Sequence, residues 1–299
     1  MVYKKTLGSA AADVVIHIVL TAFALLSVYP FWYMLIYTIS DPAQVATGLF
    51  LWPKGLSIEN IMVVLKLKGI GTALLNSVLR TVLGTALTII SCTFLGYVFT
   101  KQEMPFRKAL YRMLVVTMYV SGGLIPTYLV FRQYGLTNNF LVYILPSAVS
   151  AYNVILVKTF IEQLPPSLEE AAMIDGAGYF KVFVRVIFPL SMPIIATIAI
   201  FAAVGQWNSW FDNHIYNTTN AALTTLQYQL YKFLNESAKM AELLRESGMS
   251  ETGRALVNAL TPKTVRITTT VMAIIPIFMV YPFMQRYFIK GIMIGAVKG

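Results

Sequence analysis

The chain has 299 residues, of which 57% are apolar and 12% charged, and its mean hydropathy is +0.68. Soluble domains carry about 25% charged residues, so this composition excludes an ordinary soluble globular protein. The formal net charge is +10, but the cations are dispersed among loops instead of gathering on one soluble face, which argues against a nucleic-acid-binding module. The sequence therefore predicts an all-α integral membrane protein.

Six apolar runs are long enough to cross a bilayer as helices. In chain order, the predicted spans cover residues 14–39, 81–99, 113–131, 140–157, 186–206 and 267–285. The first run is too long for the apolar core of a signal peptide and no small-residue cleavage site follows it, so we expect it to be retained. We treat residues 1–299 as a single transmembrane domain with six transmembrane helices. An even number of spans puts both termini on the same side.

The cations of the short loops indicate which side is cytoplasmic. One side of the predicted topology holds Lys4, Lys5, Lys101, Arg107, Lys108, Arg112, Lys181, Arg185, Arg286, Lys290 and Lys298. The short loop opposite, residues 133–139, has only Arg132 beside it. Because positive charge concentrates in cytoplasmic loops, we expect a multi-pass protein of the cell membrane with both termini in the cytoplasm.

A short polar loop, residues 165–185, separates the fourth and fifth predicted spans. Two prolines end the preceding span, and Ser167 with Glu170 three residues later fits a capping box. Gly176 supplies the backbone freedom that ends a helix and turns the chain. The pattern predicts a short helix that begins at Ser167 and docks at a membrane face.

This loop resembles the EAA motif of ABC importer permeases, in which Glu-Ala-Ala is followed by three residues, Gly, nine residues and Ile-x-Leu-Pro. Val186 and Phe188 replace the Ile and Leu of that pattern and keep both positions apolar. In that family the loop is a coupling helix that sits in a cleft of a cytoplasmic ATPase subunit. The resemblance implies an ATPase-coupling site of Glu170, Ala171, Ala172, Asp175 and Gly176. Glu170 would contact an ATPase cation, and the small residues would allow close approach.

Aromatic, amide and carboxylate groups collect after the fifth predicted span. They are Gln206, Trp207, Asn208, Trp210 and Asp212. Flat rings and hydrogen-bonding groups suit a carbohydrate substrate path, whereas tryptophan is equally typical of a membrane boundary, and both interpretations stay open. Permeases of the carbohydrate-uptake branch often have a Trp-Asn dipeptide here and an ending similar to residues 290–299. The whole chain thus resembles the second permease of a binding-protein-dependent oligosaccharide importer.

The resemblance implies several partners: a homologous second permease that completes a heterodimer, two cytoplasmic ATPase subunits, and an extracytoplasmic solute-binding protein that delivers an oligosaccharide. The sequence has no Gly-x-x-x-x-Gly-Lys phosphate-binding motif. We therefore assign ATP and magnesium to the ATPase partners, and we expect this chain to be a transporter subunit and no enzyme, with neither a catalytic nor a metal site.

The external loop, residues 212–263, follows the fifth predicted span. Residues 223–234 alternate loosely between apolar and polar, and residues 237–260 are rich in helix formers. One or two amphipathic helices on the membrane or on a partner are expected. The family likeness suggests contact with the binding protein, and a solvated cap over the pore is an equal alternative.

The polar residues in and near the predicted spans bear on the mechanism of transport. The cores of the third to sixth spans hold no ionisable residue, which disfavours a proton-driven carrier, and Arg80 is predicted to snorkel to the interface instead of contacting substrate. Cys92 has no partner cysteine in the chain, and His17 and His214 are expected to have a structural or interfacial role instead of binding a ligand.

A non-ABC channel or secondary carrier remains an alternative, but it leaves the capped loop unexplained. An intramembrane enzyme would need facing ionisable residues, and only scattered ones occur.

A glycine pair ahead of a proline marks the third predicted span, in residues 121–126. Adjacent glycines let helices pack closely and let a helix hinge. We expect this segment to contribute to alternating access.

Overall fold

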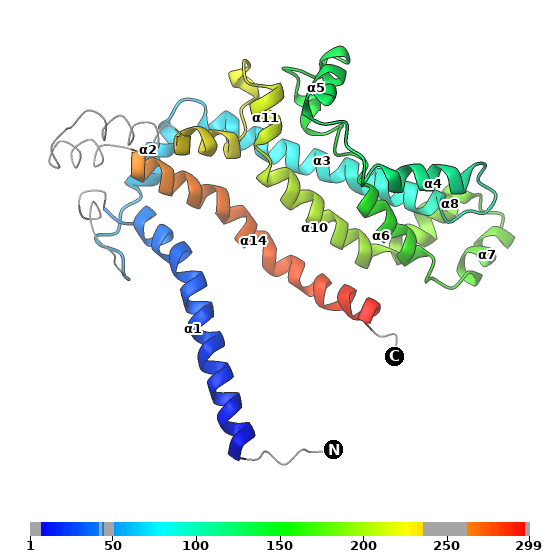
Figure 1. The fold of residues 1–299 in the computed structure, drawn as a ribbon, viewed down its shortest axis with the longest axis horizontal. Helices are drawn as coiled ribbons and strands as arrows, with labels where there is room; N and C mark the ends of the chain where they lie inside the picture. The colour runs from blue at the N-terminus through cyan, green and yellow to red at the C-terminus, as the bar shows by residue number, and fades with distance from the viewer. Residues whose placement is uncertain (1–6, 42–43, 45–50, 236–261, 297–299) are drawn as a thin grey trace. The chain divides into compact units, whose positions relative to one another are not determined.

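The computed structural model describes residues 7–41, 44, 51–235 and 262–296 (Figure 1). Over these residues the regular structure is helical, with one isolated bridge between Ser40 and Leu56. The predicted all-α class is confirmed. The chain divides into two compact units, Met1–Leu67 with Phe233–Ile274 and Lys68–Lys232 with Ile275–Gly299.

The first unit contains α1 (Leu7–Thr38), α2 (Glu59–Lys66) and the beginning of α14 (Pro262–Ala296). The apolar side chains of α1 from Val14 to Leu26 are largely exposed, as expected for a helix in contact with lipid or another membrane helix. Its C-terminal end is packed: Ile36, Tyr37 and Ile267 form a buried cluster.

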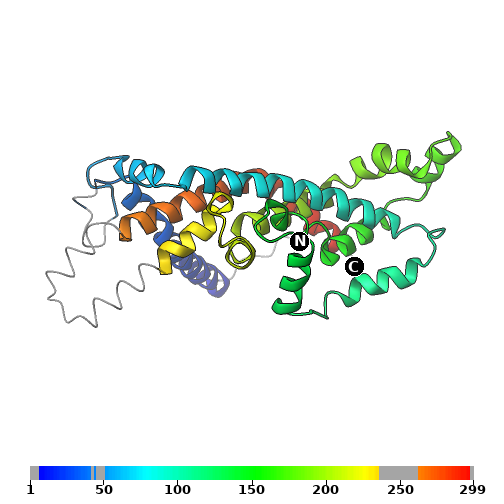
Figure 2. The ribbon, with the colours of Figure 1, turned by 90° about the horizontal axis from the view of Figure 1, so that it is seen from above.

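The second unit is organised around α3 (Ile70–Val98), against which α10 (Met192–Asn208) and α6 (Ala151–Ile161) pack. Figures 1 and 2 show α3 extending along this unit. Two glycines of α3 permit the close packing. A Cβ atom on Gly84 would lie 2.4 Å from Nε2 of Gln206, and one on Gly96 would lie 2.7 Å from Cγ1 of Val157.

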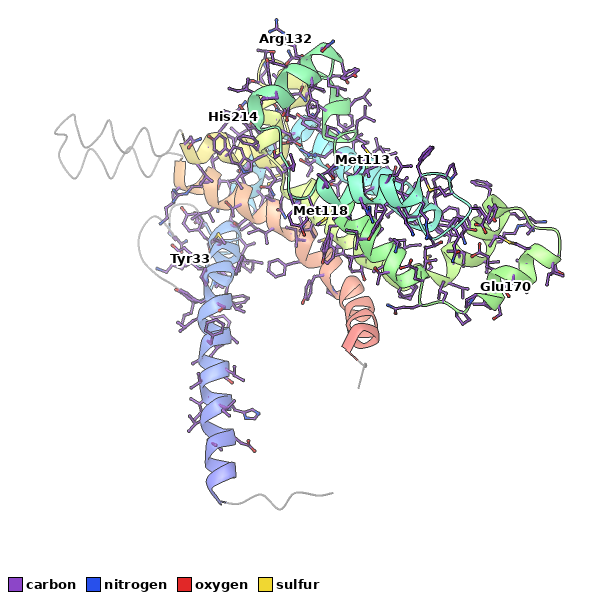
Figure 3. All side chains as sticks on the ribbon, turned by 45° about the vertical axis from the view of Figure 1, so that its right-hand side comes forward. Tyr33, Met113, Met118, Arg132, Glu170 and His214 are labelled. Carbon is purple, nitrogen blue, oxygen red and sulfur yellow. The ribbon has the colours of Figure 1, made fainter. Side chains whose placement is uncertain are left out.

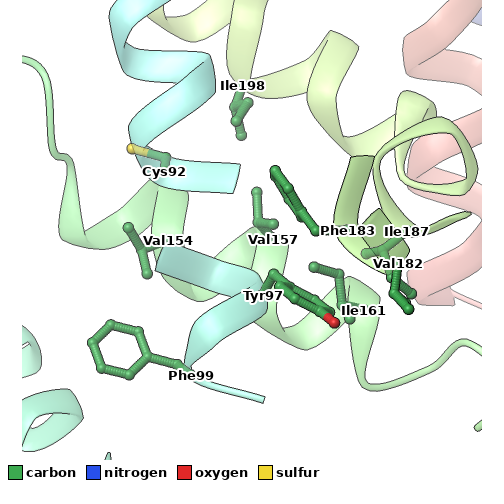
Figure 4. Close-up of a cluster of buried hydrophobic side chains, with 10 residues drawn as sticks. All are labelled: Cys92, Tyr97, Phe99, Val154, Val157, Ile161, Val182, Phe183, Ile187 and Ile198. Atoms are coloured by element: carbon green, nitrogen blue, oxygen red, sulfur yellow. The ribbon is translucent and has the colours of Figure 1, made fainter. Parts of the chain in front are cut away.

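The main buried cluster joins α3 and α6 to α10 and to the chain that precedes it (Figure 4). Its members are Cys92, Tyr97, Phe99, Val154, Val157, Ile161, Val182, Phe183, Ile187 and Ile198. The cluster fills the space between these elements with apolar side chains, so α3 and the segment after the polar loop form one packed body.

Shorter elements complete the second unit. They are α4 (Arg107–Val116), α5 (Leu124–Gln133), the 3₁₀ turn η1 (Phe140–Tyr143), α7 (Ser167–Ile174), α8 (Tyr179–Val182), the π-helical turn η2 (Phe183–Ile187), α9 (Phe188–Leu190), α11 (Phe211–Tyr216) and the 3₁₀ turn η3 (Ala221–Leu223). Residues 226–235 are also helical.

Three described helical segments are long and apolar enough to cross a membrane: Ala12–Thr38, Ile70–Val98 and Lys263–Pro282. They correspond to the first, second and sixth predicted spans. The second begins at Ile70, directly after Gly69 with its φ of 90°, and not at residue 81. The predicted fifth span is part of a bent pair, Tyr179–Leu190 and Met192–Asn208, whose axes differ by 80°.

The third and fourth predicted spans are not continuous helices, which corrects the expectation from hydropathy. Residues 113–131 are divided between α4 and α5, and Gly123, just before α5, has a φ of 81° that glycine adopts readily. Residues 140–157 are divided between η1 and α6, with Pro146 in the non-helical segment between them. Hydropathy measures the apolar character of such a segment but not its backbone breaks. The count of six spans stays a prediction.

Candidate functional site

The short helix predicted in the polar loop is α7, and it begins at Ser167 as expected. The predicted capping box is not formed, because Ser167 is already the first helical residue and no side chain caps the helix. Pro166 takes the N-cap position with a φ of −57°, and its carbonyl oxygen accepts from the amide of Glu170 at 3.1 Å. Proline suits a helix start because its fixed φ is close to the helical value.

The C-terminal end of α7 is held by two backbone hydrogen bonds. The amide of Gly176 donates to the carbonyl oxygen of Met173, and that of Ala177 donates to the carbonyl oxygen of Ala172, both at 3.0 Å. This is the Schellman arrangement. Gly176 has a φ of 79°, so the predicted role of this glycine in ending the helix is confirmed.

The predicted coupling residues are mostly exposed. Glu170, Ala171, Asp175 and Gly176 face solvent, whereas Ala172 packs against the main buried cluster. Figure 3 shows Glu170 and His214 at opposite ends of the second unit. Among the described residues, no hydrogen-bond or ion-pair partner of the Glu170 side chain is found, so its carboxylate is available to a cation on another chain.

The neighbouring Glu169, which the sequence patterns did not single out, anchors α7 to the end of α3. The hydroxyl of Tyr97 donates to its Oε1 at 2.8 Å, and the ammonium group of Lys101 forms an ion pair with the same carboxylate. Lys101 also lies over the ring of Tyr97, 4.1 Å from its centroid. The available signal was the pair of acidic residues in the first turn of α7, but only the packing shows which of them points inward.

Arg80 is buried, which overturns the expectation that it snorkels to the interface. Its side chain is 2% exposed and donates from Nη1 and Nη2 to the carboxylate of Asp212 at 3.1 and 2.5 Å. Its Nε and Nη2 donate to Oε1 of Gln206 at 3.2 and 3.1 Å. Because α3 begins ten residues before Arg80, at Ile70, the guanidinium lies within the packed helices, where these partners offset its desolvation.

A cavity of about 650 Å³ opens beside this ion pair. Its wall includes the polar groups of Arg80, Gln206 and Asp212 and the rings of Tyr143 and Tyr216. Such a combination of flat apolar faces with a few fixed polar groups is typical of a small-molecule site. The Arg80 cation lies 4.5 Å from the centroid of the Tyr143 ring, so the charge and the aromatic surface are held together.

The residues of the predicted substrate path lie in different places in the structure. Gln206 and Asp212 line the cavity, whereas Trp207 lines a separate apolar groove with Pro276 and Tyr281. The ring of Trp210 stacks on Tyr231 with centroids 4.0 Å apart. Asn208 accepts a hydrogen bond from Gln227 at 3.3 Å.

The first part of the external loop is fixed on α3. Nδ2 of Asn76 donates to the carbonyl oxygens of Ala222 and Thr224 at 2.7 and 2.9 Å, and Oγ of Ser77 accepts from the amide of Leu226 at 2.8 Å. Leu226 is fully buried. This part of the loop is therefore packed protein and not a solvated cap. The helix expected in residues 237–260 lies outside the described residues.

The remaining polar candidates have local partners. Nδ1 of His214 lies 3.4 Å from the hydroxyl of Tyr228, and Nδ1 of His17 lies 2.6 Å from the carbonyl oxygen of Asp13. Cys92 is buried and accepts from the amide of Ser150. In the described part of the chain, no group of three or more His, Cys, Asp or Glu side chains is arranged to hold a metal ion.

Residues 93–294 match the model of a protein family described as "Binding-protein-dependent transport system inner membrane component". The match covers more than half of the chain and includes α7. The chain belongs to this family. The permease assignment implied by the EAA motif is thus confirmed, and a channel or carrier outside this class is excluded as the identity of the chain.

Among similar proteins, the permease is 34% identical over 288 residues to the polygalacturonan/rhamnogalacturonan transport system permease protein YtcP of Bacillus subtilis (strain 168), with 96% of this chain and 98% of YtcP covered. It is 34% identical over 276 residues to Protein LplC of the same organism, with 92% and 90% covered.

A solved structure resembles the permease over nearly its whole length. It is a chain of a bacterial ABC transporter involved in the import of the acidic polysaccharide alginate, with a TM-score of 0.81 and 29% identity, and it covers 96% of this chain and 99% of that chain. The permease is therefore a multi-pass inner membrane transport component, a subunit of a transporter and not an enzyme.

Proposed function

We propose that this permease moves an oligosaccharide inward as one half of a translocation path completed by a homologous second permease. The observation that carries the proposal is the cavity beside Arg80, where Gln206 and Asp212 meet the rings of Tyr143 and Tyr216. Hydroxyl groups of a sugar suit the polar groups, and its C–H faces suit the rings. The similarity to a polygalacturonan/rhamnogalacturonan permease and to an alginate importer chain supports this substrate class.

Coupling to ATP hydrolysis is assigned to α7. Its exposed Glu170 would pair with a cation of a cytoplasmic ATPase subunit, while Ala171, Ala172, Asp175 and Gly176 form the rest of the docking surface. The two hydrogen bonds that end α7 keep this surface in one shape. In this proposal two ATPase subunits hold ATP and magnesium, and an extracytoplasmic solute-binding protein delivers the substrate.

The proposal includes the membrane topology of the chain. Residues 1–299 form a single transmembrane domain with six spans, and the two divided segments, α4 with α5 and η1 with α6, supply the third and fourth. Both termini lie in the cytoplasm of the cell-membrane protein, together with α7. The distribution of cations among the short loops supports this orientation.

The test is ATPase activity and sugar uptake in proteoliposomes that contain this permease with its partner permease and ATPases. Addition of binding protein and a matching oligosaccharide should stimulate both activities. Glu170→Ala should abolish the stimulation of ATPase activity while the complex stays assembled. If no ATPase copurifies with the permease, or if Glu170→Ala behaves as wild type, the coupling role of α7 is contradicted.

The role of the cavity is tested separately. Tyr216→Ala removes a ring from the cavity wall without touching α7, and it should raise the sugar concentration needed for half-maximal uptake. Thr218→Ala, two residues away and exposed, is the matched control. Unchanged sugar dependence in Tyr216→Ala would place the sugar contacts elsewhere in the complex.

A further inference from the structure

The contact among Tyr97, Lys101 and Glu169 joins two elements that are 68 to 72 residues apart in sequence. It combines a hydrogen bond, an ion pair and a cation above an aromatic ring. The side chains of Lys101 and Glu169 are only 16% and 19% exposed. Burial of this kind strengthens the attraction between the charges relative to an ion pair in open solvent.

The polar contact adds to the apolar packing of Ala172 and Met173 of α7 against the main buried cluster. A cavity of about 360 Å³, lined by Tyr97, Lys101, Glu103 and Tyr179 among others, lies next to it. Val182 of α8 is buried in the main cluster with Tyr97, so this cavity lies at the edge of the apolar packing between the end of α3 and α8. The carboxylate of Glu169 bridges to α3 beside this space, whereas the neighbouring Glu170 is directed outward.

The other half of α3 is tied to a different part of the molecule. Asn76 and Ser77 hold the segment around residues 222–226, and Arg80 holds Asp212. α3 is one helix from Ile70 to Val98, and at about 1.5 Å per residue the stretch from Arg80 to Tyr97 is about 25 Å long. One stiff element thus contacts both the coupling helix and the cavity.

We propose that Glu169 is a positioning residue for transport: its bonds to Lys101 and Tyr97 fix α7 to α3, so that a displacement of the docked α7 moves the helix that carries Arg80. This inference rests on the proposed function, in which α7 docks on the ATPase through Glu170. The two adjacent glutamates then have different roles. Glu170 faces the ATPase, and Glu169 faces the permease.

A merely structural role for Glu169 predicts a different result from a coupling role. Loss of a structural contact would lower stability, and uptake and ATPase activity would fall together. Loss of the coupling contact would leave ATPase stimulation in place, because the docking surface remains, and would reduce the amount of sugar moved per ATP hydrolysed. The ratio of the two rates is therefore the diagnostic quantity.

The experiment uses the whole complex in proteoliposomes with the oligosaccharide that stimulates the wild type, and it compares Glu169→Lys, Lys101→Glu and the double exchange. Each single reversal places like charges together and should lower the uptake-to-ATPase ratio at least tenfold. The double exchange restores opposite charges and should recover at least half of the wild-type ratio. Glu162→Lys, which breaks the partly exposed ion pair of Lys158 with Glu162, is the matched control and should keep the wild-type ratio.

Milder variants cover the case in which the reversals prevent assembly. Glu169→Gln keeps the shape of the side chain, and Tyr97→Phe removes only the hydroxyl, and each should lower the ratio at least twofold. A wild-type ratio in both variants, or a lowered ratio that the double exchange of an assembled complex does not recover, would overturn the inference.

The two proposals fail in distinguishable ways. A wild-type ratio in the Glu169 variants, in a complex whose ATPase stimulation is abolished by Glu170→Ala, contradicts only the positioning role. Full stimulation in Glu170→Ala contradicts the docking proposal itself.

Discussion

Arg80 and Asp212, 132 residues apart in the sequence, form a salt bridge with 2.5 Å between Nη2 and Oδ2. The bridge joins the first half of α3 to the start of α11 and forms part of the cavity wall. The arginine is 2% exposed and the aspartate 21%. The cation therefore depends on a few protein partners to replace the water contacts that it has lost.

Removal of the carboxylate should leave Arg80 buried without its counter-charge. We expect Asp212→Asn to lower the free energy of unfolding by about 2–3 kcal/mol, less than the usual cost of breaking a fully buried pair, because Asp212 is partly exposed. Thermal unfolding of the purified protein in detergent measures this loss. Asp175→Asn, at an exposed position of α7, is the matched control for stability. The carbonyl oxygen of Ser209 also accepts from Nη1 of Arg80 at 3.2 Å. An Asp212→Asn variant with the same midpoint as the control would show that Gln206 and this carbonyl suffice as partners.

A methyl group at Gly84 should disturb the contact between α3 and α10. Its Cβ would lie 2.4 Å from Nε2 of Gln206, which must shift. We expect Gly84→Ala to cost about 1–3 kcal/mol of stability, as overpacking does in general, and to displace Gln206 from Arg80. Gly71→Ala is the control in the same helix, because its Cβ would meet nothing within 4 Å. Equal unfolding midpoints for the two variants would contradict the close packing.

The turn after α7 should be sensitive to any side chain at Gly176. Its φ of 79° is a conformation that other residues adopt only with strain. No atom lies within 4 Å of the position for a Cβ, so the expected cost of Gly176→Ala, about 1–2 kcal/mol, comes from the backbone alone. Hydrogen exchange of the amides of Gly176 and Ala177 should accelerate. Gly178→Ala, at a φ of −74°, should leave these rates unchanged.

Asn76 should hold the external segment against α3. Asn76→Ala removes two hydrogen bonds, to the carbonyl oxygens of Ala222 and Thr224, and leaves these acceptors without that donor. We expect a loss of about 1–3 kcal/mol and faster proteolysis near residues 221–226. Gln227→Ala, which removes an exposed hydrogen bond to Asn208, serves as the control. The hydroxyl of Tyr143 also donates to the carbonyl oxygen of Leu223 at 2.7 Å. Protection equal to that of the wild type would mean that Ser77 and Tyr143 hold the segment without Asn76.

Local patterns predicted the elements whose causes are local. The start of α7 at Ser167 and its termination by Gly176 follow from two prolines and one glycine, whose backbone preferences act whatever surrounds them. The apolar composition likewise indicated a membrane protein, because a bilayer demands long apolar helices. The EAA spacing pointed to the family, which the match over residues 93–294 then confirmed.

The breaks in the third and fourth predicted spans could have been suspected but not placed. Gly123 and Pro146 are visible in the sequence, yet membrane helices tolerate both residue types, so their presence alone does not end a helix. Whether the backbone departs from the helix there depends on which neighbouring groups can satisfy its freed hydrogen-bonding atoms. The bend of 80° between Leu190 and Met192 likewise depends on the groups that surround the backbone there.

The sequence by itself determined the apolar character of the chain, the ends of α7 and the EAA pattern, because each depends on neighbouring residues or on composition. Only the tertiary structure decided that Glu169 turns inward while Glu170 faces out, and that Arg80 is buried against Asp212. The physical reason is that the charge of a side chain is local, whereas its burial and its partners come from segments far away in the chain.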